Sequence, residues 1–221
     1  MSAPGIPATT APFQSQSQSG TANQIQIPGQ TQASGMSTSA GAGGVGVSSA
    51  GGDAASYGIT STDLKTAPGV ELSSRQKLLV GSVLDLFKGL PTHKKMSLWA
   101  DTATFADPLT KAQGRKQYEA QWWGLKAAFS EIEQQSQLVT SAGNPITLDL
   151  KTRYKLKGIG SEKVIESVVK IHTDEKGESI VGVEDRWNGN IPEGAIATAF
   201  RNLNSVVVPA FVSIPKKDGD N

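Results

Sequence analysis

Residues 98–108 read LWADTATFADP, and the change of pattern within this stretch decides the fold. Pro91-Thr92, a few residues earlier, predicts the start of a short helix that runs into this stretch. This helix carries Trp99 on its inner side and ends at Asp101. The next residues, 104–106, combine a β-branched, an aromatic and a small side chain, which is typical of a short strand. Asp107-Pro108 then predicts a turn that closes this strand.

Two longer helices flank this stretch. Ser73-Ser74 precede an apolar run with the helical period and Gly89 follows it, which predicts a helix with a serine N-cap. After Gly114 a further helix is expected, because large apolar residues recur on one helical face. These residues are Tyr118, Trp122, Leu125 and Phe129.

After Phe129 the apolar period changes from 3.6 to 2, which is the period of a half-buried strand. We expect every second residue of four segments to face inward: 132–138, 148–156, 165–171 and 181–187. Helices followed by a meander of antiparallel strands predict an α+β fold, with the helices on one face of the sheet.

The charged residues are distributed unevenly along the 221 residues. Residues 1–60 contain one charged side chain, Asp53, whereas all 21 Lys and Arg follow. A polar, low-complexity segment of this kind buries too little apolar surface to fold alone. We therefore expect a disordered tail over 1–68, one domain over 69–215 and a solvated end over 216–221.

Composition excludes several classes of function. The net charge is +1 with both signs interspersed, which disfavours nucleic-acid binding, and no apolar run approaches the about 20 residues of a membrane helix. The first residues lack the pattern of a signal peptide, so we expect an intracellular protein, cytoplasmic or nuclear. There is no Cys, and His93 and His172 are far apart, so we expect no metal site and no cofactor.

The stretch 98–108, followed by Gly114 and an aromatic helix, resembles the signature of the nuclear transport factor 2-like superfamily. Members include SnoaL-type polyketide cyclases and ketosteroid isomerases, and a fungal branch is the expected origin. The resemblance implies a cone, in which a curved antiparallel sheet wraps around the long helix, with two further N-terminal helices and an apolar pocket. It does not select a function, because many activities share this scaffold.

Asp107 is the first catalytic candidate, because the resemblance places it where ketosteroid isomerases hold their general base. Such an enzyme also needs donors for an oxyanion, yet the first helix contains no Tyr and residues 165–169 contain no Asp. The alternative is that Asp107 only caps the Asp-Pro turn with its side chain.

Asp185 is the second catalytic candidate. Period-2 counting places it on the same face as Val181, Val183 and Trp187, and it resembles the pocket aspartate of SnoaL-type cyclases. An inward carboxylate has a raised pKa unless it is paired. The alternative is a salt bridge to Arg153 or Arg186 near the rim of the sheet.

The inward rows also supply the expected ligand-binding residues, which are Trp99, Phe105, Tyr118, Trp122, Tyr154, Val169, Val183 and Trp187. Two functions remain open. The first is a module for small-molecule binding or dimerisation with an apolar pocket, and the missing oxyanion donors favour it. The alternative is a cofactor-free isomerase, cyclase or dehydratase acting on a small apolar carbonyl or polyketide-like substrate. We also expect a homodimer through the outer face of the sheet, near Val168.

Overall fold

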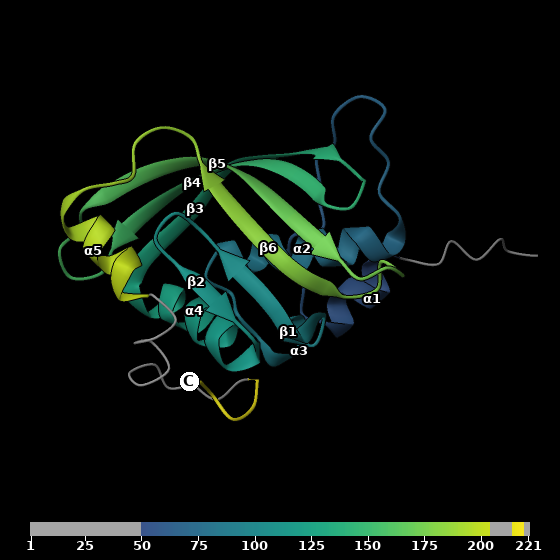
Figure 1. The fold of residues 1–221 in the computed structure, drawn as a ribbon, viewed down its shortest axis with the longest axis horizontal. Helices are drawn as coiled ribbons and strands as arrows, with labels where there is room; N and C mark the ends of the chain where they lie inside the picture. Colours follow the sequence, from purple (N-terminus) through teal and green to yellow (C-terminus); the bar gives the residue numbers. More distant parts are fainter. Residues whose placement is uncertain (1–49, 204–213, 219–221) are drawn as a thin grey trace, which may run out of the picture. The chain divides into compact units, whose positions relative to one another are not determined.

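The computed structural model describes residues 50–203 and 214–218 (Figure 1), so residues 1–49 of the tail predicted over 1–68 lie outside the described residues. The helices are α1 (Ala50–Ser56), α2 (Ser74–Phe87), α3 (His93–Met96), α4 (Arg115–Ala128) and α5 (Gly194–Asn202). The strands are β1 (Trp99–Ala106), β2 (Lys111–Gln113), β3 (Phe129–Ser141), β4 (Ile146–Leu156), β5 (Glu162–Thr173) and β6 (Ile180–Trp187).

The strands form one sheet in the order β2-β1-β6-β5-β4-β3, with α2 and α4 against one face (Figure 1). Neighbouring strands from β3 to β6 are antiparallel, as predicted. However, β1 runs parallel to β6, with Phe105 opposite Val183. A parallel pair needs a long connection, which α4 and the strands after it provide. The α+β fold class is therefore confirmed, with a mixed rather than a purely antiparallel sheet.

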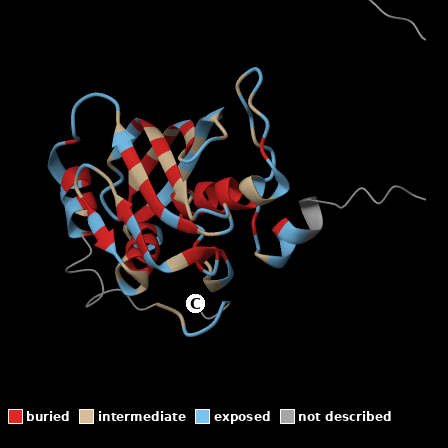
Figure 2. Cartoon of the chain, turned by 45° about the vertical axis from the view of Figure 1, so that its right-hand side comes forward, coloured by how far each residue is buried: buried red, intermediate tan, exposed pale blue. Residues whose placement is uncertain are grey.

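The helices predicted around 98–108 are present. Ser73 caps α2 through a reciprocal capping box with Gln76, and Gly89 follows the helix at φ +71°. The inner residues of α2 and α4 are buried, and buried residues alternate along the strands (Figure 2). The stretch itself differs from the prediction: α3 ends at Met96, so Trp99 begins β1 instead of ending a helix. Pairing with β6 extends this strand beyond the expected 104–106.

Two irregularities change which residues face inward. In β3 the register shifts between Gln134 and Ser136, so Val139 is buried and Leu138 is exposed. In β6 the register shifts beside Ile180, which leaves Val181 exposed while Val183 and Asp185 are buried. The expected inward positions of Ser136, Leu138 and Val181 were therefore wrong. A bulge adds one residue and turns the following side chains to the other face.

A segment that we call the N-terminal strap, residues 57–68, belongs to the folded part. Asp85 of α2 accepts hydrogen bonds from the backbone and hydroxyl groups of Thr60 (2.8 and 2.8 Å) and of Ser61 (3.0 and 2.7 Å). The strap then pairs with β3, where Ala67 donates to the Val139 carbonyl at 2.8 Å. Residues of the expected tail thus bind to the domain through α2 and β3. Apolar periodicity did not reveal this segment, because hydrogen bonds hold it.

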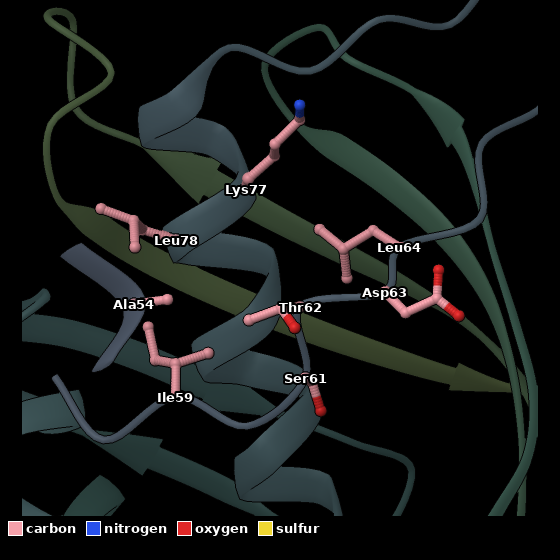
Figure 3. A pocket seen from close by; sticks show the side chains of 8 residues that line it. All are labelled: Ala54, Ile59, Ser61, Thr62, Asp63, Leu64, Lys77 and Leu78. Carbon is pink, nitrogen blue, oxygen red and sulfur yellow. The ribbon is translucent and has the colours of Figure 1, made fainter. Parts of the chain in front are cut away.

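The strap lies close to α2 around a hollow of about 310 Å³ (Figure 3). Gly81 makes this approach possible, because a Cβ atom there would lie 2.5 Å from the Ser61 carbonyl oxygen. Lys95 completes the anchor with an ion pair of 2.9 Å to Asp85, and both side chains are buried. The hydrogen bonds to Asp85 outweigh its desolvation and lower its pKa.

Candidate functional site

A cavity of about 10 Å³ lies between the helices and the sheet. A space of this size holds about one water molecule. Residues from α2, α4, α5 and three strands line it, and six of the ten are aromatic. The lining residues are Phe87, Phe105, Asp107, Gln121, Trp122, Leu125, Tyr154, Asp185, Trp187 and Phe200.

Asp185 enters this cavity from β6, opposite Val169 of β5, and is 6% exposed. Its Oδ2 accepts a hydrogen bond of 2.7 Å from the Trp187 indole, whereas Oδ1 has no partner among the described residues. Burial raises the pKa of Asp185 to about 6, although the neighbouring Ser167 hydroxyl and the Trp187 indole oppose this shift. The inward direction predicted for Asp185 is therefore present.

The alternative for Asp185, a salt bridge to an arginine, is not what the structure shows. Arg153 instead pairs with Glu131 (2.5 Å) and Glu133 (2.8 Å). Arg186 pairs with Glu184 at 2.7 Å. Asp185 is thus a buried carboxylate whose two expected cationic partners bind glutamates.

Asp107 follows β1 and caps the Asp-Pro turn, which was the alternative to a catalytic role. Its Oδ1 accepts a hydrogen bond of 2.7 Å from the Leu109 backbone, so it does cap the Asp-Pro turn. It also lines the cavity. Burial raises the pKa of Asp107 to about 7 and the charge of Asp185 adds to this rise, while bonds from Leu109 and Thr110 oppose it.

Tyr154 supplies a phenol where sequence reasoning found no donor. The resemblance implies oxyanion donors on the first helix and within residues 165–169, but Tyr154 reaches the cavity from β4. Burial raises the pKa of Tyr154 well above its usual range, and the charges of Asp185 and Asp107 raise it further. The phenol therefore shares one electrostatic environment with both carboxylates.

Several polar atoms in the cavity wall lack a hydrogen-bond partner. In the described part of the chain these are Asp185 Oδ1, Gln121 Oε1 and Trp122 Nε1, and all three residues are buried. A buried donor or acceptor left without a partner costs about 1–3 kcal/mol. Three residues of one cavity wall thus carry a buried polar atom whose partner the described residues do not supply.

Helix α5 closes one side of the cavity with Phe200. The centroid of its ring lies 5.1 Å from Phe129, 5.4 Å from Tyr154 and 5.1 Å from Trp187. The helix has nine residues and no side-chain hydrogen bond at its N-cap. Phe200 is therefore the part of the cavity wall carried by the shortest helix that reaches it.

The structure separates the expected ligand-binding residues into two groups. Phe105, Trp122, Tyr154 and Trp187 line the cavity, whereas the other four are buried in the core away from it; these are Trp99, Tyr118, Val169 and Val183. The ring of Trp99, for example, packs on Tyr118 at 5.1 Å.

Sequence reasoning missed four residues of the cavity wall, which are Phe87, Gln121, Leu125 and Phe200. Phe87 and Leu125 lay on helical faces that were correctly predicted to be buried. Gln121 and Phe200 gave no such signal, because only the packed fold brings them to the cavity.

Within residues 50–203 and 214–218, no group of three or more His, Cys, Asp or Glu residues could hold a metal ion. In the same ranges, no helix combines the length and the apolar composition that crossing a membrane requires.

Comparison with known proteins gives similar solved structures only. No family model and no curated protein matches the chain. A protein with a ketosteroid isomerase-like fold from Catenulispora acidiphila, solved in complex with trimethylamine, is 17% identical with a TM-score of 0.41, over 48% of this chain and 82% of its own. A protein described as a SnoaL-like polyketide cyclase from Shewanella denitrificans is 14% identical with a TM-score of 0.43, over 52% and 90%.

A steroid delta-isomerase from Pseudomonas aeruginosa is 16% identical with a TM-score of 0.42, over 61% of this chain and 92% of its own. At these values the likeness concerns the fold alone and supports no statement about ligand or reaction. The fungal branch stays a prediction. These three solved structures are described as a protein with a ketosteroid isomerase-like fold, a SnoaL-like polyketide cyclase and a steroid delta-isomerase.

Proposed function

We propose that this chain binds a small, mostly apolar molecule in the cavity at Asp107 and Asp185. The observation that carries the proposal is the set of three unpartnered buried atoms, Asp185 Oδ1, Gln121 Oε1 and Trp122 Nε1, in an aromatic cavity. Ligand sites combine mostly apolar walls with a few placed polar groups. A core that served stability alone would fill this position with apolar side chains or pair its polar atoms.

The cavity of about 10 Å³ must enlarge before it admits more than water. Displacement of the Phe200 side chain enlarges the cavity at the least cost, because Phe200 lies on α5 and packs mainly against other cavity residues. Gly189 lies in the connection between β6 and α5 and Gly194 is the first residue of α5, and both have a positive φ. We therefore propose that a ligand takes the place of the Phe200 ring.

The test is a titration with benzyl alcohol, a small aromatic molecule with one polar group, followed by the indole N–H signals in nuclear magnetic resonance spectra. Binding in the cavity shifts the Trp122 and Trp187 signals. Trp123 is the internal control, because its ring packs on His93 at 5.2 Å and does not line the cavity. If no signal moves, or if Trp123 moves as much as Trp122, the proposed site is wrong.

A second candidate function is proton transfer without a cofactor, and the carboxyl pair favours it. The pKa of Asp107 is raised to about 7 and that of Asp185 to about 6, so the pair exchanges protons near neutral pH. One carboxylate can accept a proton from a substrate while the other carboxyl group, or Tyr154, donates a hydrogen bond to a developing oxyanion. This arrangement supplies the donors that the sequence lacked at the expected positions.

The probe for this second function is 5-nitrobenzisoxazole, which opens to a coloured cyanophenolate when a base removes its C3 proton. A cavity carboxylate acting as the base accelerates the opening, and a positioned base is worth about 10²–10⁴-fold. Asp107→Asn and Asp185→Asn then identify the base by the larger loss of rate. If both variants react like the unmodified protein, the enzyme function is wrong and the binding function is unaffected.

A further inference from the structure

We infer that the cavity is selective for a small organic cation, such as a protonated amine attached to an apolar group. This inference rests on the proposed function, because it names the class of ligand for the same cavity. Three independent features of the wall support it: its charge, its aromatic rings and its unpartnered acceptors.

The charge of the wall is negative only. Asp107 and Asp185 are its charged groups, and none of the ten lining residues is Lys, Arg or His. Lys95 and Arg115, which do not line the cavity, pair with Asp85 and Asp101. A buried carboxylate at Asp185 and a half-buried one at Asp107, with no cation in the wall, are unfavourable, so a positive ligand between them compensates their desolvation.

Aromatic rings form most of the remaining wall. Trp122 has its ring centroid 4.7 Å from Phe105 and 5.2 Å from Phe87, while Trp187 packs on Phe200 at 5.1 Å. The faces of such rings attract cations, most strongly those of Trp and Tyr, and the attraction increases where water is excluded. The same rings give no comparable advantage to a ligand with a negative charge.

The unpartnered atoms match the donors of an ammonium group. Asp185 Oδ1 and Gln121 Oε1 are acceptors without a donor in the described residues, and a primary ammonium carries three N–H donors. Trp122 Nε1 is a donor that needs an acceptor, which a hydroxyl group on the ligand or one retained water supplies. A carboxylate ligand would leave both acceptors unpaired.

The titratable groups that face the ligand are Asp107 after β1, Tyr154 of β4 and Asp185 of β6. The residues that α2, α4 and α5 contribute do not titrate; these are Phe87, Gln121, Trp122, Leu125 and Phe200. A cation therefore binds more tightly as the two carboxyl groups lose their protons. A neutral ligand that accepts a hydrogen bond binds more tightly while the two carboxyl groups keep their protons.

The experiment compares benzylamine, which is protonated between pH 6 and pH 8, with benzyl alcohol, its neutral analogue of similar size. Dissociation constants are measured from the Trp122 indole signal at both pH values. The pKa of Asp107 is about 7. For such a group the ionised fraction rises from about one tenth at pH 6 to about nine tenths at pH 8, so we expect benzylamine to bind about tenfold more tightly at pH 8.

Asp185→Asn keeps the shape of the side chain and removes its charge, so it removes the preference for benzylamine over benzyl alcohol. Asp149→Asn is the matched control, because Asp149 is exposed on β4, and it leaves the preference unchanged. Asp107→Asn provides a second variant and abolishes most of the pH dependence.

The outcomes separate the two proposals. If benzyl alcohol binds as tightly as benzylamine at pH 8, or if the amine weakens as pH rises, the cation inference is overturned and the ligand site stands. If neither molecule moves the Trp122 signal, the proposed function itself fails. If Asp149→Asn lowers the amine preference as much as Asp185→Asn, general surface charge explains the preference and the inference is wrong.

Discussion

At the scale of single residues, Asp185 shows how the sheet buries a carboxylate without a cation. It accepts one hydrogen bond from Trp187 and lies beside Ser167, and its other oxygen has no partner among the described residues. Desolvation of an ionised carboxyl group lowers the free energy of unfolding unless partners compensate it. The stability of this protein should therefore depend on the charge of this one residue.

We predict that Asp185→Asn stabilises the protein, and does so increasingly as pH rises from 4 to 7. The pKa of Asp185 is raised from 3.8 to about 6, so the folded state binds more protons than the unfolded state across this range. The free energy of unfolding of the original protein therefore falls with rising pH, and this fall is absent in the variant. The difference should reach about 3 kcal/mol at pH 7, at about 1.4 kcal/mol for each unit of pKa difference.

Urea denaturation of both proteins at pH 4, 5, 6 and 7 measures this difference. Asp149→Asn is again the control, since Asp149 is exposed. A constant difference across the range would mean that Asp185 has the same pKa in the folded and unfolded states.

Sequence reasoning reached some of these residues and not others. Period-2 counting found the inward direction of Asp185, because one bulge near Ile180 displaced only Val181. It gave the wrong face for Leu138, because a second bulge lies within β3. Gln121 could not be found, since a polar residue in a helix gives no periodic signal.

At the scale of elements, local signals predicted α2, α4 and the strands from β3 to β6. Their apolar periods and capping residues lie within short windows of sequence. The parallel pairing of β1 with β6 depends on residues about 80 positions apart, which no local pattern encodes. The strap was missed for another reason, because its attachment is a set of hydrogen bonds to Asp85.

We predict that deletion of residues 1–65 destabilises the protein by more than about 3 kcal/mol, because Asp85 loses four hydrogen bonds to Thr60 and Ser61. Each hydrogen bond to a charged group contributes about 1.5–3 kcal/mol, and Lys95 then remains as its main partner. Deletion of residues 1–49, which contain no charged side chain, is the control and should leave the melting temperature unchanged. Equal melting temperatures for the two deletions would show that the strap does not hold α2.

At the scale of the whole molecule, the outer face of the sheet is mainly charged. Arg153 bridges strands through Glu131, Glu133 and Glu162, and Lys151 pairs with Glu166 at 2.7 Å. These ion pairs form within one chain, so the charges of Arg153 and Lys151 are compensated without a partner subunit. Val164 is an apolar residue on this face and is 39% exposed.

The homodimer through this face stays a prediction. Light scattering at micromolar concentration should give twice the chain mass of 23.1 kDa, and Val168→Glu should reduce it to that of one chain. Val168 is partly exposed on β5 and pairs with Arg186 of β6, so a charge there disturbs the face without entering the core. A single-chain mass for the original protein would rule out this dimer.

The measurement that tests the central claim most directly is the affinity of benzyl alcohol for Phe200→Ala. If the cavity is a ligand site closed by α5, this variant removes the ring that a ligand must displace, so benzyl alcohol should bind at least about fivefold more tightly than to the original protein. Ile196→Ala is the matched control, because Ile196 is also buried on α5 but does not line the cavity. Unchanged or weaker binding to Phe200→Ala, or the same gain in Ile196→Ala, would contradict the account.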